Sequence, residues 1–130
     1  METFISKNPE QTKELAAQLC KNAKLILLSG ELGSGKTTFT KGLGAQFGLS
    51  EKEIKSPSYT IIREYDGFMH ADFYRLEQVD ELILERIKSW DGIVVIEWPE
   101  IMLDLLPTPH LHLTIERMGE EEREIQLISR

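Results

Sequence analysis

One stretch of the chain has the residue types and the spacing that phosphate binding requires. It matches the whole G-x-x-x-x-G-K-T pattern, with the residues Gly30-Glu31-Leu32-Gly33-Ser34-Gly35-Lys36-Thr37. The glycines let the backbone curl so that successive amide N–H groups point at anionic oxygens. The Lys36 ammonium can reach the β- and γ-phosphates of a nucleotide, and the Thr37 hydroxyl can ligate Mg²⁺. The pattern therefore predicts a site for a nucleoside triphosphate and Mg²⁺.

The sequence on both sides of this loop supports the same interpretation. Residues 24–29 are mostly apolar and are typical of a buried strand, whereas residues 37–47 have the spacing of a helix that Gly48 ends. A glycine-rich turn could match the pattern by chance, but here all four fixed positions and both flanks agree. We expect the nucleotide to contact the following loop and helix residues: Glu31, Leu32, Gly33, Ser34, Gly35, Lys36, Thr37 and Thr38.

A nucleotide hydrolase also needs an acidic group that holds the metal shell or polarises the attacking water. Glu97 follows the apolar run 93–96, where the second nucleotide-binding motif usually has Asp at the end of a buried strand. It could also be an ordinary carboxylate at a strand end. Trp98 comes next, and it could pack against a base or a partner protein, or serve only in structural packing.

Three further residues could contribute to the same chemistry. Asp72 ends the run 68–72 and could bind Mg²⁺ through water or orient the nucleophile, so the spacing leaves open whether Asp72 or Glu97 activates water. Extended backbone would put His70 on the same face as Asp72, and we expect His70 to be a hydrogen-bonded structural residue. Thr60 is either a switch residue that closes over the γ-phosphate or a plain strand threonine.

The order of the elements predicts a single P-loop NTPase domain over residues 1–130. It is a three-layer α/β sandwich whose mixed sheet is mainly parallel at its centre and antiparallel at its C-terminal strands. Asn8 and Pro9 begin the first helix, and Asp66-Gly67 predicts a tight hairpin between the strands 59–65 and 68–72. Alternating runs at 111–117 and 124–128 predict a second antiparallel pair.

Another helix is expected over residues 79–90, followed by a short one over 99–106. The helix 79–90 has an apolar stripe that we expect to face the sheet. Its members are Val79, Leu82, Ile83, Ile87 and Trp90.

Composition limits the classes of function. Hydrophobic residues make up 41% and charged residues 28%, as in a soluble globular protein, and no apolar run approaches the roughly 18 residues of a membrane span. With no signal-peptide pattern and one cysteine, Cys20, we expect a cytoplasmic protein with no membrane contact. The net charge of −7 argues against DNA or RNA as the main direct ligand and is easier to reconcile with a protein partner.

The motifs that are missing narrow the choice of nucleotide and reaction. There is no Asn-Lys-x-Asp or Thr-Lys-x-Asp sequence, so guanine selectivity is unsupported and ATP is the expected nucleotide. No segment is long enough to form the lid of a small-molecule kinase. Arg63, Arg75 and Arg86 are candidates for an arginine finger, and nothing in the sequence distinguishes them.

Four segments together resemble the bacterial TsaE family, formerly called YjeE. They are Gly-Glu-Leu-Gly-Ser-Gly-Lys-Thr-Thr-Phe at 30–39, Ser-Pro-Ser-Tyr-Thr at 56–60, His-Ala-Asp-Phe-Tyr-Arg-Leu at 70–76 and Ile-Glu-Trp-Pro-Glu at 96–100. The phosphate loop alone is generic, whereas the last two segments in combination are specific. Ser58-Tyr59 stands where Thr-Phe is common in the family, and Thr60 is retained.

The resemblance implies a small ATPase required for N(6)-threonylcarbamoyladenosine formation on tRNA. Its partners would be TsaD, which transfers the threonylcarbamoyl group, and TsaB, with tRNA reached only through their complex. ATP turnover would reset that assembly. The family pattern implies that Lys36 and Thr37 hold phosphate and Mg²⁺, Thr60 is the switch threonine, Asp72 and Glu97 are the acidic pair and Trp98 lies beside the site.

Two other classes of function remain open from the sequence. In one, the protein is a nucleotide-dependent binding module, in which ATP stabilises one conformation and hydrolysis is incidental. In the other, it is a small-molecule phosphotransferase, which the missing lid and acceptor pocket disfavour.

Overall fold

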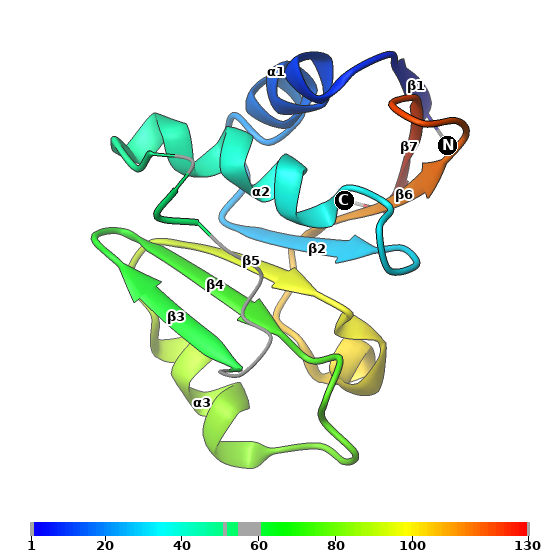
Figure 1. Ribbon diagram of the computed structural model, residues 1–130. Coiled ribbons are helices and arrows are strands. Elements are labelled where there is room, and N and C mark those ends of the chain that lie inside the picture. Colours follow the sequence, from blue (N-terminus) through cyan, green and yellow to red (C-terminus); the bar gives the residue numbers. More distant parts are fainter. Residues whose placement is uncertain (1, 51, 55–60, 130) are drawn as a thin grey trace.

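The apolar run before the phosphate loop forms the centre of a mixed β-sheet (Figure 1). The computed structural model describes residues 2–50, 52–54 and 61–129, and these residues form seven strands in the order β1-β7-β6-β2-β5-β4-β3. The strands are β1 (Glu2–Ser6), β2 (Leu25–Ser29), β3 (Ile62–Tyr65), β4 (Phe68–Asp72), β5 (Ile93–Glu97), β6 (Leu111–Arg117) and β7 (Arg123–Ser129).

Strand direction follows the prediction from sequence. The four central neighbours β6, β2, β5 and β4 are parallel, whereas β1–β7, β6–β7 and β3–β4 pair antiparallel. The expected hairpin is present, since Tyr65 pairs with Phe68 across Asp66 and Gly67. The carboxyl ends of the parallel strands therefore meet at one edge of the sheet, which is where open α/β sheets bind ligands.

Helices cover both faces of the sheet, as Figure 1 shows. On one face lie α1 (Pro9–Leu19) and α2 (Lys36–Gly44), which continues as the 3₁₀ turn η1 (Ala45–Phe47). On the other face lie α3 (Glu81–Ser89) and the 3₁₀ helix η2 (Pro99–Leu105). This confirms the three-layer α/β sandwich. No helix in the described part of the chain is long and apolar enough to cross a membrane.

Strand β2 is apolar on both faces because it is packed on both faces. Ile26 and Leu28 join the core under α1 and α2, and Leu25 and Leu27 join the core under α3. Fully burying a leucine side chain contributes about 1.5–3 kcal/mol. This double packing holds the strand that leads into the phosphate loop.

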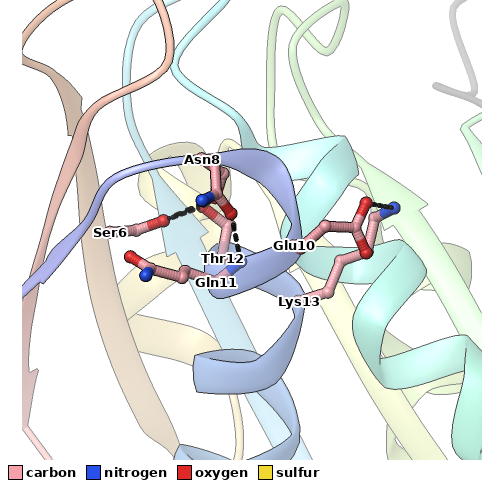
Figure 2. Close-up of polar contacts among 6 residues, drawn as sticks. All are labelled: Ser6, Asn8, Glu10, Gln11, Thr12 and Lys13. Carbon is pink, nitrogen blue, oxygen red and sulfur yellow. Dashed lines mark hydrogen bonds and ion pairs between the residues drawn. The ribbon is translucent and has the colours of Figure 1, made fainter.

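The start of α1 has the predicted cap (Figure 2). The Asn8 side chain accepts a hydrogen bond from the Gln11 backbone N–H at 2.9 Å, and the Ser6 hydroxyl donates to the Asn8 carbonyl at 2.8 Å. Gln11 in turn accepts from the Lys7 N–H at 2.8 Å. These bonds satisfy backbone groups that the first helical turn leaves unpaired.

The helix expected over residues 79–90 is shorter than predicted, and part of its stripe is wrong. Asp80 caps α3 by accepting from the backbone N–H groups of Leu82 and Ile83, so Val79 lies outside the helix. Leu82 is 80% exposed, whereas Leu84, which the predicted stripe omitted, is buried. The cap fixes where the helix begins, and the sheet-facing positions that follow from it belong to Ile83, Leu84 and Ile87.

Candidate phosphate-binding and hydrolysis site

The loop between β2 and α2 has the backbone conformation of an anion-binding loop. Gly33 and Gly35 have φ angles of 80° and 108°, in the left-handed region that favours glycine. The Ser34 N–H donates to the Glu31 carbonyl at 3.1 Å, and the Gly35 carbonyl accepts from Phe39 in the first turn of α2. Such a curl, directly followed by a helix N-terminus, concentrates N–H groups and positive dipole at one place.

The loop is also packed tightly against strand β6. A Cβ atom on Gly30 would lie 2.5 Å from the Ile115 carbonyl oxygen and 2.6 Å from the Ser34 hydroxyl, so only glycine fits there. Ser34 is 2% exposed, and its hydroxyl has no hydrogen-bond partner among the residues that the structure describes. A buried hydroxyl without a partner is costly, and the oxygen of a bound phosphate would satisfy it.

Lys36 folds back over the loop. Its ammonium donates to the carbonyls of Gly30 at 2.5 Å and Glu31 at 2.9 Å, and it lies 4.3 Å from the centre of the Trp98 ring. Burial lowers the pKa of Lys36, and the negative charge of Glu97, the strongest of several nearby carboxylates, opposes that shift. A buried cation that carbonyl groups solvate can exchange them for phosphate oxygens when an anion enters.

Two carboxylates arrive at this place from neighbouring parallel strands. Asp72 and Glu97 end β4 and β5 and are cross-strand partners, and Glu97 also lies opposite Leu28 of β2. Glu97 is 3% exposed, and its Oε2 lies 2.5 Å from Nε2 of fully buried His70. The expectation that His70 is a hydrogen-bonded residue is therefore confirmed, with Glu97 as its partner.

Asp72 has a different environment from Glu97. Its Oδ1 accepts a hydrogen bond from the Tyr74 N–H at 2.8 Å, just beyond the end of β4. Burial raises the pKa of Asp72, and the hydrogen bond from Tyr74 opposes that rise. The adjacent charge of Glu97 raises the pKa of Asp72 further, whereas His70 and Lys36 lower it. A second cation near both carboxylates would relieve this repulsion.

The arrangement fits Mg²⁺ bound together with a nucleotide. Thr37 lies in the first turn of α2, half-buried, and the two nearby carboxylates are Asp72 and Glu97. In the described ranges, no group of three or more His, Cys, Asp or Glu side chains could hold a metal ion. Mg²⁺ usually binds through one or two carboxylates, a hydroxyl and phosphate oxygens rather than through a complete protein cage. The residues present therefore suit a metal that enters with the nucleotide.

The remaining predicted contact residues lie at the edge of the loop. Glu31, Leu32 and Gly33 are exposed, and Thr38 is half-buried in the first turn of α2. Thr60 lies outside the described residues.

Trp98 combines an unusual backbone conformation with a place beside Lys36. Its φ and ψ are both 56°, a left-handed conformation that costs a bulky residue on the order of 1–3 kcal/mol. Its ring centre lies 4.8 Å from that of Tyr74, which is half exposed. Pro99 begins η2 immediately afterwards. The turn thus holds an aromatic face against the Lys36 ammonium.

Three residues that the sequence analysis did not single out form a network at the base of the loop. The Ser29 hydroxyl, at the end of β2, donates to the Glu100 carboxylate and lies 2.9 Å from His112 Nε2 on β6. Glu100 also acts on the charge of Lys36. Glu100 belongs to the Ile-Glu-Trp-Pro-Glu segment, which was a usable signal. His112 had none, because the pairing of β6 with β2 cannot be read from local sequence.

Known proteins resemble the chain in sequence and in fold. The family model described as "Threonylcarbamoyl adenosine biosynthesis protein TsaE" matches residues 6–125. The chain is 40% identical over 126 residues to the tRNA threonylcarbamoyladenosine biosynthesis protein TsaE of Bacillus subtilis, an alignment that covers 91% of this chain and 79% of that relative. The protein of the same name from Borreliella burgdorferi is 40% identical over 105 residues, covering 74% and 75% respectively.

A solved structure supports the fold assignment. The crystal structure of Bacillus subtilis YdiB superimposes with a TM-score of 0.74 at 32% sequence identity, covering 97% of this chain and 83% of that one. The layered sheet described above is thus the P-loop NTPase fold. The family match spans nearly all of the strands and helices that build the loop and its two carboxylates. The chain belongs to the TsaE family.

Proposed function

We propose that this protein binds ATP with Mg²⁺ and hydrolyses the ATP as an accessory factor in tRNA threonylcarbamoyladenosine biosynthesis. The pathway is the one named in the family model and in the relatives. One observation carries the hydrolytic part: the buried Lys36 ammonium lies in the field of Glu97 and Asp72, at the mouth of a loop lined by N–H groups. Cation, carboxylates and helix N-terminus are the parts that phosphoryl transfer requires.

Each residue has a role in this proposal that follows from its position. Lys36 exchanges its two loop carbonyls for phosphate oxygens, and the Ser34 hydroxyl gains its missing partner. Thr37 and a carboxylate hold Mg²⁺, which when bound would offset negative charge on the phosphates. The other carboxylate orients the attacking water, and His70 keeps the Glu97 side chain in one orientation.

The partners in this proposal are the TsaB and TsaD proteins, and tRNA takes part through their complex. The net charge of −7 favours a protein surface over direct contact with a nucleic acid backbone. ATP turnover resets the assembly, since the site has the parts for phosphoryl transfer and none assigned to a carbamoyl substrate. We propose the cytoplasm as its location, in line with the single buried cysteine, Cys20, whose pKa burial raises to about 12.

The test removes the loop cation. We expect Lys36→Ala to weaken ATP binding about 10- to 100-fold, as loss of a charge-assisted hydrogen-bonding group does, and to abolish stimulated hydrolysis. Calorimetry measures the first, and phosphate release with TsaB and TsaD present measures the second. Lys88→Ala, an exposed lysine on α3, is the matched control. Unchanged turnover of the Lys36 variant would refute the site assignment.

The same assay separates hydrolysis from simple binding. We expect modification of tRNA beyond one round to need ATP, and a non-hydrolysable analogue to support at most a single round. Repeated rounds with the analogue would instead identify a nucleotide-dependent binding module.

A further inference from the structure

The β6–β7 hairpin brings an arginine to the phosphate loop. A Cβ atom on Gly35 would meet Arg123 Nε at 3.3 Å, Cδ at 3.7 Å and Cγ at 3.8 Å, so the arginine side chain lies along the open face of that glycine. Arg123 is the first residue of β7 and pairs with Ser6 on one side and Arg117 on the other. Gly35 directly precedes Lys36 in the phosphate-binding pattern. The arginine is therefore next to the loop although it is distant in sequence.

One nitrogen of Arg123 is anchored, and the rest of the guanidinium is not. Nη1 donates to the carbonyls of Gly119 at 3.2 Å, Glu120 at 3.3 Å and Glu122 at 2.9 Å, all within the hairpin. Within the described part of the chain, Nε and Nη2 have no hydrogen-bond partner, and Arg123 forms no ion pair. A guanidinium has five N–H donors, so several remain available beside Gly35.

The charges around Arg123 are arranged for an anion. The helix dipole places positive potential at the start of α2, where a further cation is unfavourable by about 0.3–1 kcal/mol. Lys36 adds a second positive charge, and the orphaned Ser34 hydroxyl is buried in the same loop. Two cations and a helix N-terminus repel one another unless a negative group lies between them, and a phosphate chain is such a group.

We propose that Arg123 is a nucleotide-binding residue, which donates hydrogen bonds from its guanidinium to the phosphate chain held by the loop. This inference rests on the proposed function. It also answers the question of which arginine serves the site. Arg86 is paired with Glu64 on the surface at 3.0 Å, Arg63 is exposed on edge strand β3, and Arg75 lines a hollow before α3.

The experiment compares two arginines that face each other across the hairpin. Calorimetry with Mg²⁺ measures the affinity of the isolated protein for ATP and for AMP. We expect Arg123→Gln to bind ATP about 10- to 100-fold more weakly, the range for losing a charge-assisted hydrogen bond, with a smaller loss for AMP, which has one phosphate. Arg117→Gln is the control, because Arg117 is exposed and donates from Nε to the Gly119 carbonyl. It should bind ATP within about 2-fold of the unmodified protein, as surface changes usually do.

Loss of the hairpin structure must be distinguished from loss of the contact. Arg123→Lys keeps a positive charge and a donor for the hairpin carbonyls but lacks the planar fork. Thermal unfolding without nucleotide reports whether either variant has lost stability. An Arg123→Lys protein that stays folded and binds ATP several-fold more weakly supports the proposal. ATP affinity unchanged in both variants, or an equal loss in Arg117→Gln, overturns it.

Failure of the proposed function has a different signature. If the unmodified protein binds no ATP, the proposed function falls, and this inference falls with it. If the unmodified protein binds ATP and Lys36→Ala weakens binding while Arg123→Gln does not, only the role of Arg123 is overturned.

Discussion

The two sides of strand β2 contribute to the site in different ways. On the β5–β4 side, consecutive parallel strands end in Glu97 and Asp72, and the side chains are ordered by cross-strand register. On the β6–β7 side, the contacts are made by a backbone carbonyl at Ile115 and by Arg123 from a hairpin. Negative groups enter from one side and a positive group from the other. We infer that the acidic side governs hydrolysis and that the hairpin side governs binding.

The largest expected effect tests the acidic side. Glu97→Gln keeps the shape of the side chain and removes its charge. If Glu97 holds the metal or orients water, hydrolysis should fall about 10²–10⁴-fold, the range for removing a positioned acid or base. ATP affinity should change little or improve, because Glu97 is the carboxylate that acts most strongly on Lys36. Phosphate release and calorimetry measure the two quantities.

A control for Glu97→Gln is available on the edge strand. Glu64→Gln removes an exposed carboxylate of β3 whose partner is Arg86. It should leave both quantities unchanged, since exposed ion pairs contribute little. If Glu97→Gln weakened ATP binding as strongly as it slowed hydrolysis, the division between the two sides of β2 would be wrong.

An intermediate effect is expected on the β6 side. Gly30→Ala puts a Cβ atom 2.5 Å from the Ile115 carbonyl oxygen, so the loop and β6 must separate. Overpacking of this kind costs about 1–3 kcal/mol, which lowers the melting temperature by several degrees in a domain of this size. ATP affinity should fall too, and thermal unfolding with and without ATP measures both. In Gly119→Ala the new atom meets only the Glu122 Cβ at 3.7 Å, and neither quantity should change.

The sequence predicted the acidic side better than the hairpin side, for a physical reason. The strand ends at Asp72 and Glu97 follow from short apolar runs, and parallel strands necessarily present their carboxyl ends at one edge. The approach of Arg123 to Gly35 depends on β6 pairing with β2, between segments such as Ile26 and Leu111 that are far apart in sequence. No local pattern encodes that pairing.

The error in the helix α3 has the same origin on a smaller scale. Apolar periodicity placed Leu82 in the buried stripe, but the helix begins only after the Asp80 cap, and the exposed position falls to Leu82. Periodicity fixes spacing along a helix, whereas packing against the sheet decides which phase is buried. The prediction that Thr60 is a switch residue lies outside the described residues and stays a prediction.

The smallest expected effect concerns stability on the acidic side. Asp72→Asn should stabilise the protein at pH 7 by about 1 kcal/mol, the usual size of such a gain, while hydrolysis falls. Burial raises the pKa of Asp72 above its ordinary value of 3.8, so the folded state binds more protons than the unfolded state between those two pKa values. Stability from this group is thus present at low pH and lost as pH rises through the raised pKa.

Asparagine removes that loss because it carries no charge at any pH and keeps the oxygen that accepts the Tyr74 N–H at 2.8 Å. Denaturant unfolding from about pH 3 to pH 8 should therefore show the stabilisation at neutral pH shrinking as the solution is acidified. Asp104→Asn, at an exposed position of η2, should show no such trend. A less stable Asp72→Asn protein at pH 7 would mean that attraction to Lys36 and His70 outweighs burial. In that case the acidic side would be held together by its charges, and the two sides of β2 would not differ as we infer.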